Sequence, residues 1–151
     1  MTNTLLLIAQ IAGRRCALDA LDVKSVIELG AITPIPRAPA YIAGITALRS
    51  QTLTVIDCRL ALGLPQQSWP TDDRAAVVAE GGHAYALMVD AIEDITTAVG
   101  APGQVPGGFG AQWSRAASGM IETMIGPALL LDLPALLAGP DTGRGEIGAA
   151  A

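Results

Sequence analysis

Short apolar runs recur along the chain and predict β-strands. Four of them read TLLLIAQIA, RRCALDAL, AAVVAE and HAYALMVD, and each is apolar or alternates between apolar and polar positions. They occupy residues 4–12, 14–21, 75–80 and 83–90 and are separated by glycine or basic residues. Glycine supplies the positive φ of a tight hairpin turn without steric cost, so turns are predicted at Gly13-Arg14 and Gly81-Gly82.

Two further apolar runs, residues 45–48 and 53–57, flank a polar break that carries Arg49. This pattern predicts a hairpin with Arg49 at its tip. An arginine there is either a solvated turn residue or a permanently charged donor for a partner's carboxylate or carbonyl groups, and the spacing alone favours the first. A helix is predicted in DLPALLAG, where Asp132 caps the start and Gly139 ends it.

The two halves of the chain resemble each other. Moving the first half forward by 69 positions places Gly13 on Gly82, and a shift of 75 places Gly44 on Gly119. The difference of six falls where the second half has the Pro/Gly-rich segment 100–110, a loop that tolerates insertion. The chain therefore contains two copies of one small all-β unit, at residues 5–64 and 74–138.

A unit of about 60 residues buries too little surface to be stable alone, so the copies are expected to pack together with a groove between them. Together they make one domain, residues 5–138, and exchange of strands between the copies is left open. The small and polar residues 139–151 are expected to form a flexible tail.

Charge and hydropathy narrow the classes of function. The net charge is −5 and the nine Lys and Arg residues are scattered, which leaves no basic face for nucleic acid or an anionic membrane. No stretch approaches the roughly 20 apolar residues that span a bilayer. The N-terminal run lacks the basic start of a signal peptide, so a cytoplasmic protein is expected. Cys16 and Cys58 are interpreted as small buried apolar residues.

Catalytic and metal-binding patterns are weak. His83 follows a Gly-Gly turn with no nucleophile or orienting carboxylate near it in the sequence, so it is interpreted as a solvated turn residue. Ser118 lacks the glycines of a nucleophile elbow. A G-x-G-x-x-G pattern at residues 143–148 has no helix after it and is a false positive. The acidic residues are interpreted as solubilising edge carboxylates: Asp72, Asp73, Asp90, Glu93 and Asp94. No catalytic, cofactor or metal site is predicted.

The segment 26–65, VIELGAITPIPRAPAYIAGITALRSQTLTVIDCRLALGLP, resembles the CheW family of bacterial chemotaxis coupling proteins. The family signature joins a Thr/Pro-rich lead-in, a Pro-bearing turn, a G-(V/I)-x-N-L-R-G hairpin and a (V/I)-(V/I)-D-L-R end. The matching positions are Thr33-Pro34, Ala38-Pro39, Gly44-Ile45, Leu48-Arg49, Val55-Ile56-Asp57 and Arg59. ALMVDAIEDI and LLLDLPALL fit the second half of the family, so the likeness covers residues 5–138.

The resemblance implies an all-β fold of two packed five-stranded SH3-like barrels with short helical turns and a C-terminal helix. It also implies an adaptor with no catalysis and no cofactor, monomeric when free. Its expected partners are the cytoplasmic tip of a chemoreceptor and the regulatory domain of the histidine kinase CheA. The protein would be cytoplasmic and recruited to membrane-bound receptor arrays.

The resemblance also implies contact residues. The receptor-facing set carried over from the family is Val23, Ile42, Gly44, Ile45 and Arg49. Contacts with the kinase are assigned to Met124 and Ile125, for which ordinary core packing is the favoured alternative.

Three positions depart from the family pattern. Ala47 and Ser50 replace an Asn and a Gly of the hairpin, and Ser25 replaces a common Glu. Serine disfavours positive φ, so a different turn geometry is expected around Arg49. These departures keep open an adaptor of a non-chemotactic kinase pathway, or a relative that caps an array without coupling. An enzyme acting through the acidic residues is a distant third hypothesis.

Overall fold

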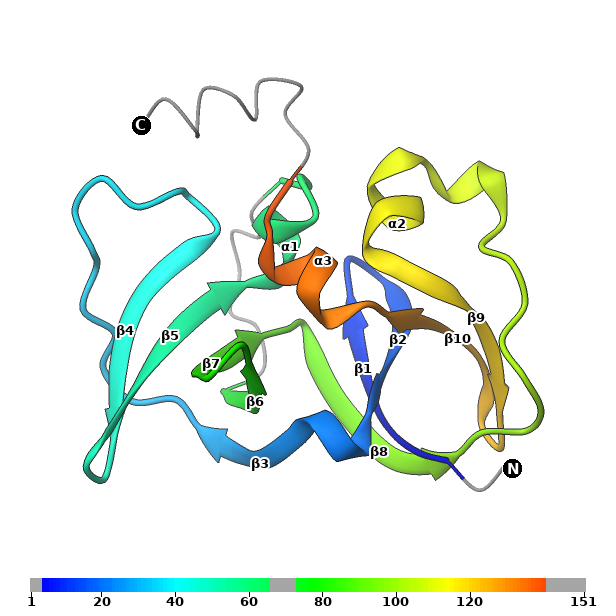
Figure 1. The fold of residues 1–151 in the computed structure, drawn as a ribbon, viewed down its shortest axis with the longest axis horizontal. Helices are drawn as coiled ribbons and strands as arrows, with labels where there is room; N and C mark the ends of the chain where they lie inside the picture. The colour runs from blue at the N-terminus through cyan, green and yellow to red at the C-terminus, as the bar shows by residue number, and fades with distance from the viewer. Residues whose placement is uncertain (1–3, 66–72, 141–151) are drawn as a thin grey trace.

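The computed structural model describes residues 4–65 and 73–140 of the 151-residue chain, and most of them form β-strands (Figure 1). Asp72, the glycine pattern at residues 143–148 and residues 141–151 of the expected tail lie outside the described residues. The strands are β1 (Leu5–Ile11), β2 (Arg14–Asp19), β3 (Val23–Glu28), β4 (Ile42–Leu48), β5 (Gln51–Asp57), β6 (Arg74–Glu80), β7 (His83–Met88), β8 (Ala91–Thr97), β9 (Ala117–Thr123) and β10 (Gly126–Leu131). The helices are α1 (Cys58–Ala61), α2 (Ala111–Ala116) and α3 (Leu133–Leu137), with 3-10 turns η1 (Ala20–Asp22) and η2 (Gly107–Phe109).

The strands form two sheets that each close into a barrel. Barrel A has the strand order β8-β1-β2-β10-β9, and barrel B has the order β3-β6-β7-β5-β4. In barrel B the segment after β3 pairs with β4 through Thr33 and Ile45, which joins the two edges. In barrel A the segment after β8 pairs with β9 through Gly103 and Met120. The predicted fold of two five-stranded barrels is confirmed.

Each barrel takes strands from both halves of the chain. Barrel A combines β1 and β2 from the first half of the chain with β8, β9 and β10 from the second half. Replacing each strand of barrel A by its counterpart in the other half, which is five strands earlier or later in the chain, gives the strand order of barrel B. The strand starts repeat the offsets of the sequence: β1 and β6 begin at residues 5 and 74, and β4 and β9 begin at residues 42 and 117. Neither half closes a barrel without strands of the other.

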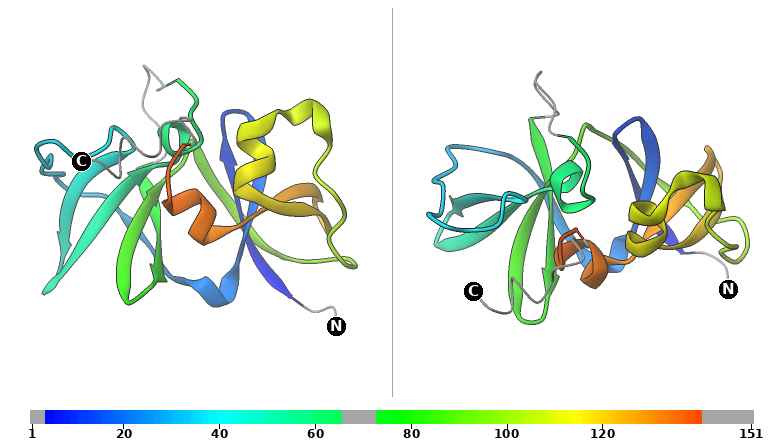
Figure 2. Two further views of the ribbon diagram at one scale, coloured as in Figure 1. Left: turned by 45° about the horizontal axis from the view of Figure 1, so that its top comes forward. Right: turned by 90° about the horizontal axis from the view of Figure 1, so that it is seen from above.

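The largest hydrophobic cluster lies between the barrels. Along β1, Leu7 and Ile11 belong to this inter-barrel core, whereas Leu6 and Ile8 point into barrel A. In barrel B, Val78 belongs to the inter-barrel core, and the adjacent Val77 on β6 points into the barrel. Strands buried on both faces need apolar residues at every position, which explains why the first run of the sequence is continuously apolar. Figure 2 shows α3 between the two barrels from two further directions.

The β1–β2 turn lies one residue earlier than predicted. Its two central residues are Ala12 and Gly13, with φ of 54° and 79°, whereas Gly81 and Gly82 turn as expected. The N–H of Ala12 donates to Oδ2 of Asp90 at 2.9 Å, which holds this turn in place.

Asp90 is also held by Arg59, the last residue of the family signature. Arg59 Nε donates to Oδ1 at 3.0 Å and Nη2 to Oδ2 at 2.9 Å. This two-point ion pair ties α1 to the link between β7 and β8, and through Asp90 to the β1–β2 turn.

The helices are short and lie around the junction between the barrels. Helix α3 is confirmed, with Asp132 Oδ1 accepting a hydrogen bond from the N–H of Ala135 and Gly139 at φ 87°. Helix α2 has no counterpart among the predicted elements. Its Arg115 donates to the carbonyls of Ala61 and Ala135, which connects the three helices. No helix among the described residues has both the length and the apolar composition needed to cross a bilayer.

Cys16 and Cys58 are free thiols buried in the inter-barrel core, as predicted. Burial disfavours the thiolate and raises the pKa of Cys16 to about 12. Burial also raises the pKa of Cys58, well above its ordinary value.

We therefore expect both thiols to be inert in the folded protein. Near pH 8, Cys16 with a pKa of about 12 has about a thousandth of the thiolate of an ordinary cysteine. Iodoacetamide should therefore label Cys16 in the native protein about a thousandfold more slowly than in the denatured protein. Mass spectrometry at timed intervals measures the rate. Native labelling as fast as that of denatured protein would show that the core does not hold these residues.

Candidate partner-binding surface

The hairpin that carries Arg49 has a two-residue tip. Leu48 pairs with Gln51, so Arg49 and Ser50 are the central residues of the turn. Arg49 has φ 58°, and Ser50 is not among the residues with positive φ. The left-handed conformation therefore falls on Arg49 and not on the position where the family has glycine. It costs an arginine about 1–2 kcal/mol.

The Arg49 side chain lies at the surface of barrel B. The residue is exposed and makes no hydrogen bond or ion pair with the described part of the chain. Its five N–H donors are therefore available to a partner.

A β-bulge places Ile42 and Ile45 on one face of barrel B. Ile42 pairs with Ile56 and Ile45 pairs with Thr54, so three steps along β4 match two steps along β5. Without the bulge the two isoleucines would point to opposite faces of the sheet. Both side chains are half-buried.

Val23 lies on this same outer face, at the start of β3. Paired residues on neighbouring strands point to the same face of a sheet. The pairs that connect Val23 to Ile45 across barrel B are Val23–Val78, Val78–Tyr85, Tyr85–Thr54 and Thr54–Ile45. Val23 and Ile42 are half-buried and pack against the inter-barrel core. We call Val23, Ile42 and Ile45 the barrel B apolar face.

Gly44 differs from the other predicted contact residues because it is buried. It has φ 149°, and a Cβ at this position would overlap the carbonyl oxygen of Thr33 and lie 2.8 Å from Cγ2 of Ile32. Gly119 repeats this close approach in barrel A, against the carbonyl of Gly103 at 2.6 Å. Gly44 therefore lets the segment after β3 cross β4 and close the barrel.

Met124 and Ile125 are the two central residues of the β9–β10 turn of barrel A. Their exposed fractions are 72% and 41%, so the interpretation as core residues is wrong. The turn is held because Arg15 Nη1 donates to the carbonyl of Ile125 at 2.9 Å. In Figure 1 this hairpin and the β4–β5 hairpin lie at opposite sides of the molecule.

The acidic residues after β7 are engaged in structural contacts. Asp90 is bound by Arg59, and Glu93 accepts from Arg15 Nε at 3.1 Å and from Gln10 Nε2 at 2.6 Å. No group of three or more His, Cys, Asp or Glu side chains among the described residues could hold a metal ion. His83 is exposed, as predicted, but it is the first residue of β7, where it pairs with Glu80, and not a turn residue.

The sequence does not reveal the Arg59–Asp90 pair, and the interpretation of Asp90 as an edge carboxylate is wrong. Arg59, two positions after the helix cap Asp57, is the available signal, but its partner lies 31 positions further along the chain, and sequence spacing does not reveal the contact.

Comparisons with known proteins agree on one family. Residues 5–141 match the CheW-like domain. The chain is 38% identical over 66 residues to the chemotaxis protein CheW of Rhizobium meliloti (strain 1021), covering 43% of this chain and 42% of that protein. It is 27% identical over 96 residues to the chemotaxis protein CheW of Bacillus subtilis (strain 168), covering 64% and 62%. The matched segments thus span about half the length of these curated relatives.

A solved structure shares the fold. The scaffolding protein TtCheW from Thermoanaerobacter tengcongensis superposes with a TM-score of 0.75 at 24% identity, over 88% of this chain and 86% of that one. At this identity the likeness establishes the architecture of the two barrels.

If Gly44 serves barrel closure, Gly44→Ala should destabilise the protein. Overpacking against Thr33 and the unfavourable φ should together remove about 3 kcal/mol from the free energy of unfolding. Urea unfolding followed by far-UV circular dichroism measures the loss. Gly30→Ala is the matched control, because its Cβ would have open space and Gly30 has no positive φ. Equal midpoints for the two variants would contradict the assignment.

Proposed function

The chain belongs to the CheW-like domain family, and on this premise we propose that it is a non-catalytic adaptor in bacterial chemotaxis signalling. Its proposed partners are the cytoplasmic tip of a chemoreceptor and the regulatory domain of a CheA-type histidine kinase. The working unit is the single domain of residues 5–138, cytoplasmic and recruited to receptor arrays at the membrane.

The observation that carries the proposal is that the barrel B apolar face and the exposed Arg49 lie on the same barrel of a CheW-like domain. The barrel B apolar face offers half-buried side chains on a rigid sheet, and Arg49 offers unpaired donors at the end of the same hairpin. A receptor tip is a helical hairpin, and an amphipathic helix binds by laying its apolar stripe on such a surface. Arg49 would then bond to a carboxylate or to exposed carbonyls of that helix.

A second surface on the other barrel would allow two partners to bind together. We assign the kinase contact to the exposed Met124-Ile125 turn of barrel A. A receptor on barrel B and a kinase on barrel A would not compete for the same residues. The adaptor would couple the receptor to the kinase because the binding of one partner changes the binding free energy of the other.

A receptor-independent cap is the second candidate. Ser25, Ala47 and Ser50, the three departures from the family pattern, are all exposed. They therefore alter the contact surface without altering the core. A cap would bind the kinase and leave its activity unchanged by receptor.

Charge reversal at Arg49 tests the receptor contact. Arg49→Glu should weaken binding of a receptor-tip fragment about tenfold or more, which is the loss expected for a charge-assisted hydrogen bond, and leave kinase binding unchanged. Isothermal titration calorimetry measures both. Arg37→Glu is the matched control, because Arg37 is also exposed, lies in the same barrel and has positive φ. Equal effects of the two substitutions would remove Arg49 from the receptor contact.

The adaptor function itself is tested by reconstitution. Size-exclusion chromatography of the purified protein with the kinase regulatory domain and the receptor-tip fragment, singly and together, should give two binary complexes and one ternary complex. Kinase assays with full-length partners should then show receptor control only when the protein is present. Binary complexes without receptor control would favour the cap, and no complex with either partner would refute both candidates.

A further inference from the structure

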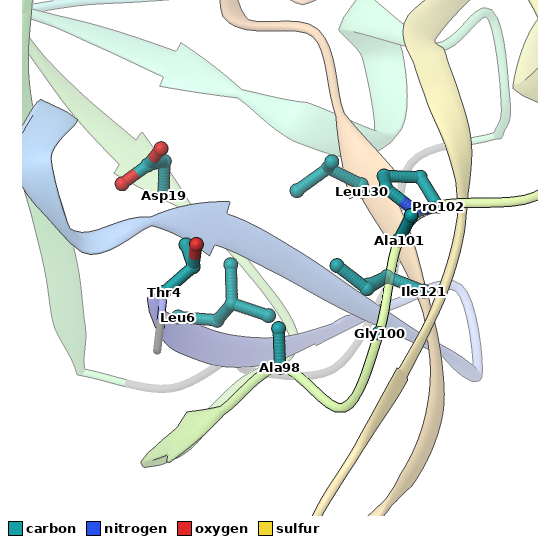
Figure 3. Close-up of a pocket in the computed structure, with 9 residues that line it drawn as sticks. All are labelled: Thr4, Leu6, Asp19, Ala98, Gly100, Ala101, Pro102, Ile121 and Leu130. Atoms are coloured by element: carbon teal, nitrogen blue, oxygen red, sulfur yellow. The ribbon is translucent and has the colours of Figure 1, made fainter. Parts of the chain in front are cut away.

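A cavity of about 450 Å³ opens into the end of barrel A. Figure 3 shows the side chains of Leu6, Ile121 and Leu130 directed toward a common space, with Asp19 across from Pro102. Leu6 and Ile121 are 1% and 4% exposed, so the floor of the cavity lies below the molecular surface. A concave apolar cavity of this volume is typical of sites that bind small molecules.

The internal repeat shows what fills the corresponding space in barrel B. Asp19 is the last paired residue of β2, and 69 positions later Met88 is the last paired residue of β7. Ala98 corresponds to Leu29 at the same offset. Met88 and Leu29 both pack against the interior cluster of barrel B. Barrel A therefore has a carboxylate and a methyl group where barrel B has two larger apolar side chains.

The segment that crosses each barrel adds a third difference. Pro102 Cβ lies 3.0 Å from the Cβ position of Gly119, and Ile32 Cγ2 lies 2.8 Å from that of Gly44. Pro102 therefore occupies the place of Ile32, which also packs against the interior cluster of barrel B. Among the described residues, seven half-buried apolar residues pack against that cluster, whereas Leu130 alone packs against the interior cluster of barrel A. Barrel A thus lacks the side chains that close its counterpart.

The lining favours a ligand with positive charge. Among the described residues that line the cavity, Asp19 is the one charged side chain. Its Oδ1 accepts from the N–H of Leu21 at 3.0 Å, and its Oδ2 has no partner in the described part of the chain. A carboxylate oxygen without a partner, at the edge of an apolar cavity, attracts an ammonium group and repels an anion.

We propose that the open end of barrel A binds a small protonated amine with a branched aliphatic body. The aliphatic body contacts Leu6 and Ile121, and the ammonium group pairs with Oδ2 of Asp19. The body is branched because Leu29 of barrel B carries an isopropyl group that Ala98 lacks, and the ligand fills this missing space. This inference is independent of the proposed adaptor function, because it uses only the cavity and the comparison of the two barrels.

Titration with isopentylamine tests the site near pH 7, where the amine is protonated. Amide chemical shifts of the ¹⁵N-labelled full chain report binding. The amides of Leu6, Ala98 and Leu130 should shift and saturate at millimolar concentration, as expected for a ligand of this size. Two controls separate charge from shape: 4-methylpentanoate keeps the branched body with a negative charge, and ethylamine keeps the charge without the branched body. Both should bind at least fivefold more weakly.

Variants that copy barrel B locate the site. Ala98→Leu and Pro102→Ile should each fill the cavity and abolish the shifts, and both are used in case one does not fold. Asp19→Asn keeps the hydrogen bond to Leu21 and should lower the affinity for isopentylamine at least threefold. Asp22→Asn is the matched control, because it removes the same charge from an exposed residue outside the lining and should leave the affinity unchanged.

Four results would overturn the proposal. They are the absence of saturable shifts with isopentylamine, shifts that persist in both filled variants, equal losses of affinity in Asp19→Asn and Asp22→Asn, and binding of 4-methylpentanoate as tight as that of isopentylamine. Binding of the tripeptide acetyl-Lys-Leu-Lys-amide without binding of isopentylamine would also overturn it, in favour of a polypeptide ligand.

Discussion

The two barrels stay together because the outer faces of both sheets are apolar and are buried against each other. Among the described residues, the inter-barrel core contains 21 buried residues, whereas the clusters inside barrels A and B contain six and five. Most of the hydrophobic stabilisation therefore depends on the two barrels being in contact. Strand exchange has the same consequence, because each barrel is completed by strands from the other half of the chain. The protein should unfold as one unit, and its barrels should not separate when a partner binds.

A rigid centre leaves the hairpin tips and barrel ends as the places where partners can be contacted. Strands β5 and β10 contribute Ile56, Leu129 and Leu131 to this core near their ends, while the tips of the β4–β5 and β9–β10 hairpins extend away from it (Figure 1). Short turns on paired strands hold their side chains in fixed positions, so a partner binds without ordering a long loop. In the proposed adaptor function, the fold would set the geometry between the two partners.

Differences between the two copies are informative because the core tolerates few of them. Glycine is kept at residues 44 and 119, where the crossing segment comes too close for a Cβ. In contrast, Arg49 on one hairpin corresponds to Met124 on the other. Core packing does not account for this exchange, since both residues are exposed. In the proposed function the two hairpins contact different partners.

The sequence by itself determined the strands β1, β2, β4, β5, β6 and β7, the helix cap at Asp132 and the offsets of the repeat. These depend on local periodicity and on single residues such as glycine. It also determined the family, because the block around residues 44–59 has a specific pattern. Only the tertiary structure decided that the strands are exchanged, that Arg59 binds Asp90 and that Gly44 lies beneath the carbonyl of Thr33. It also revealed the exposure of Met124 and the open end of barrel A. These features join residues far apart in the chain, and local periodicity carries no information about which distant segment covers a given face.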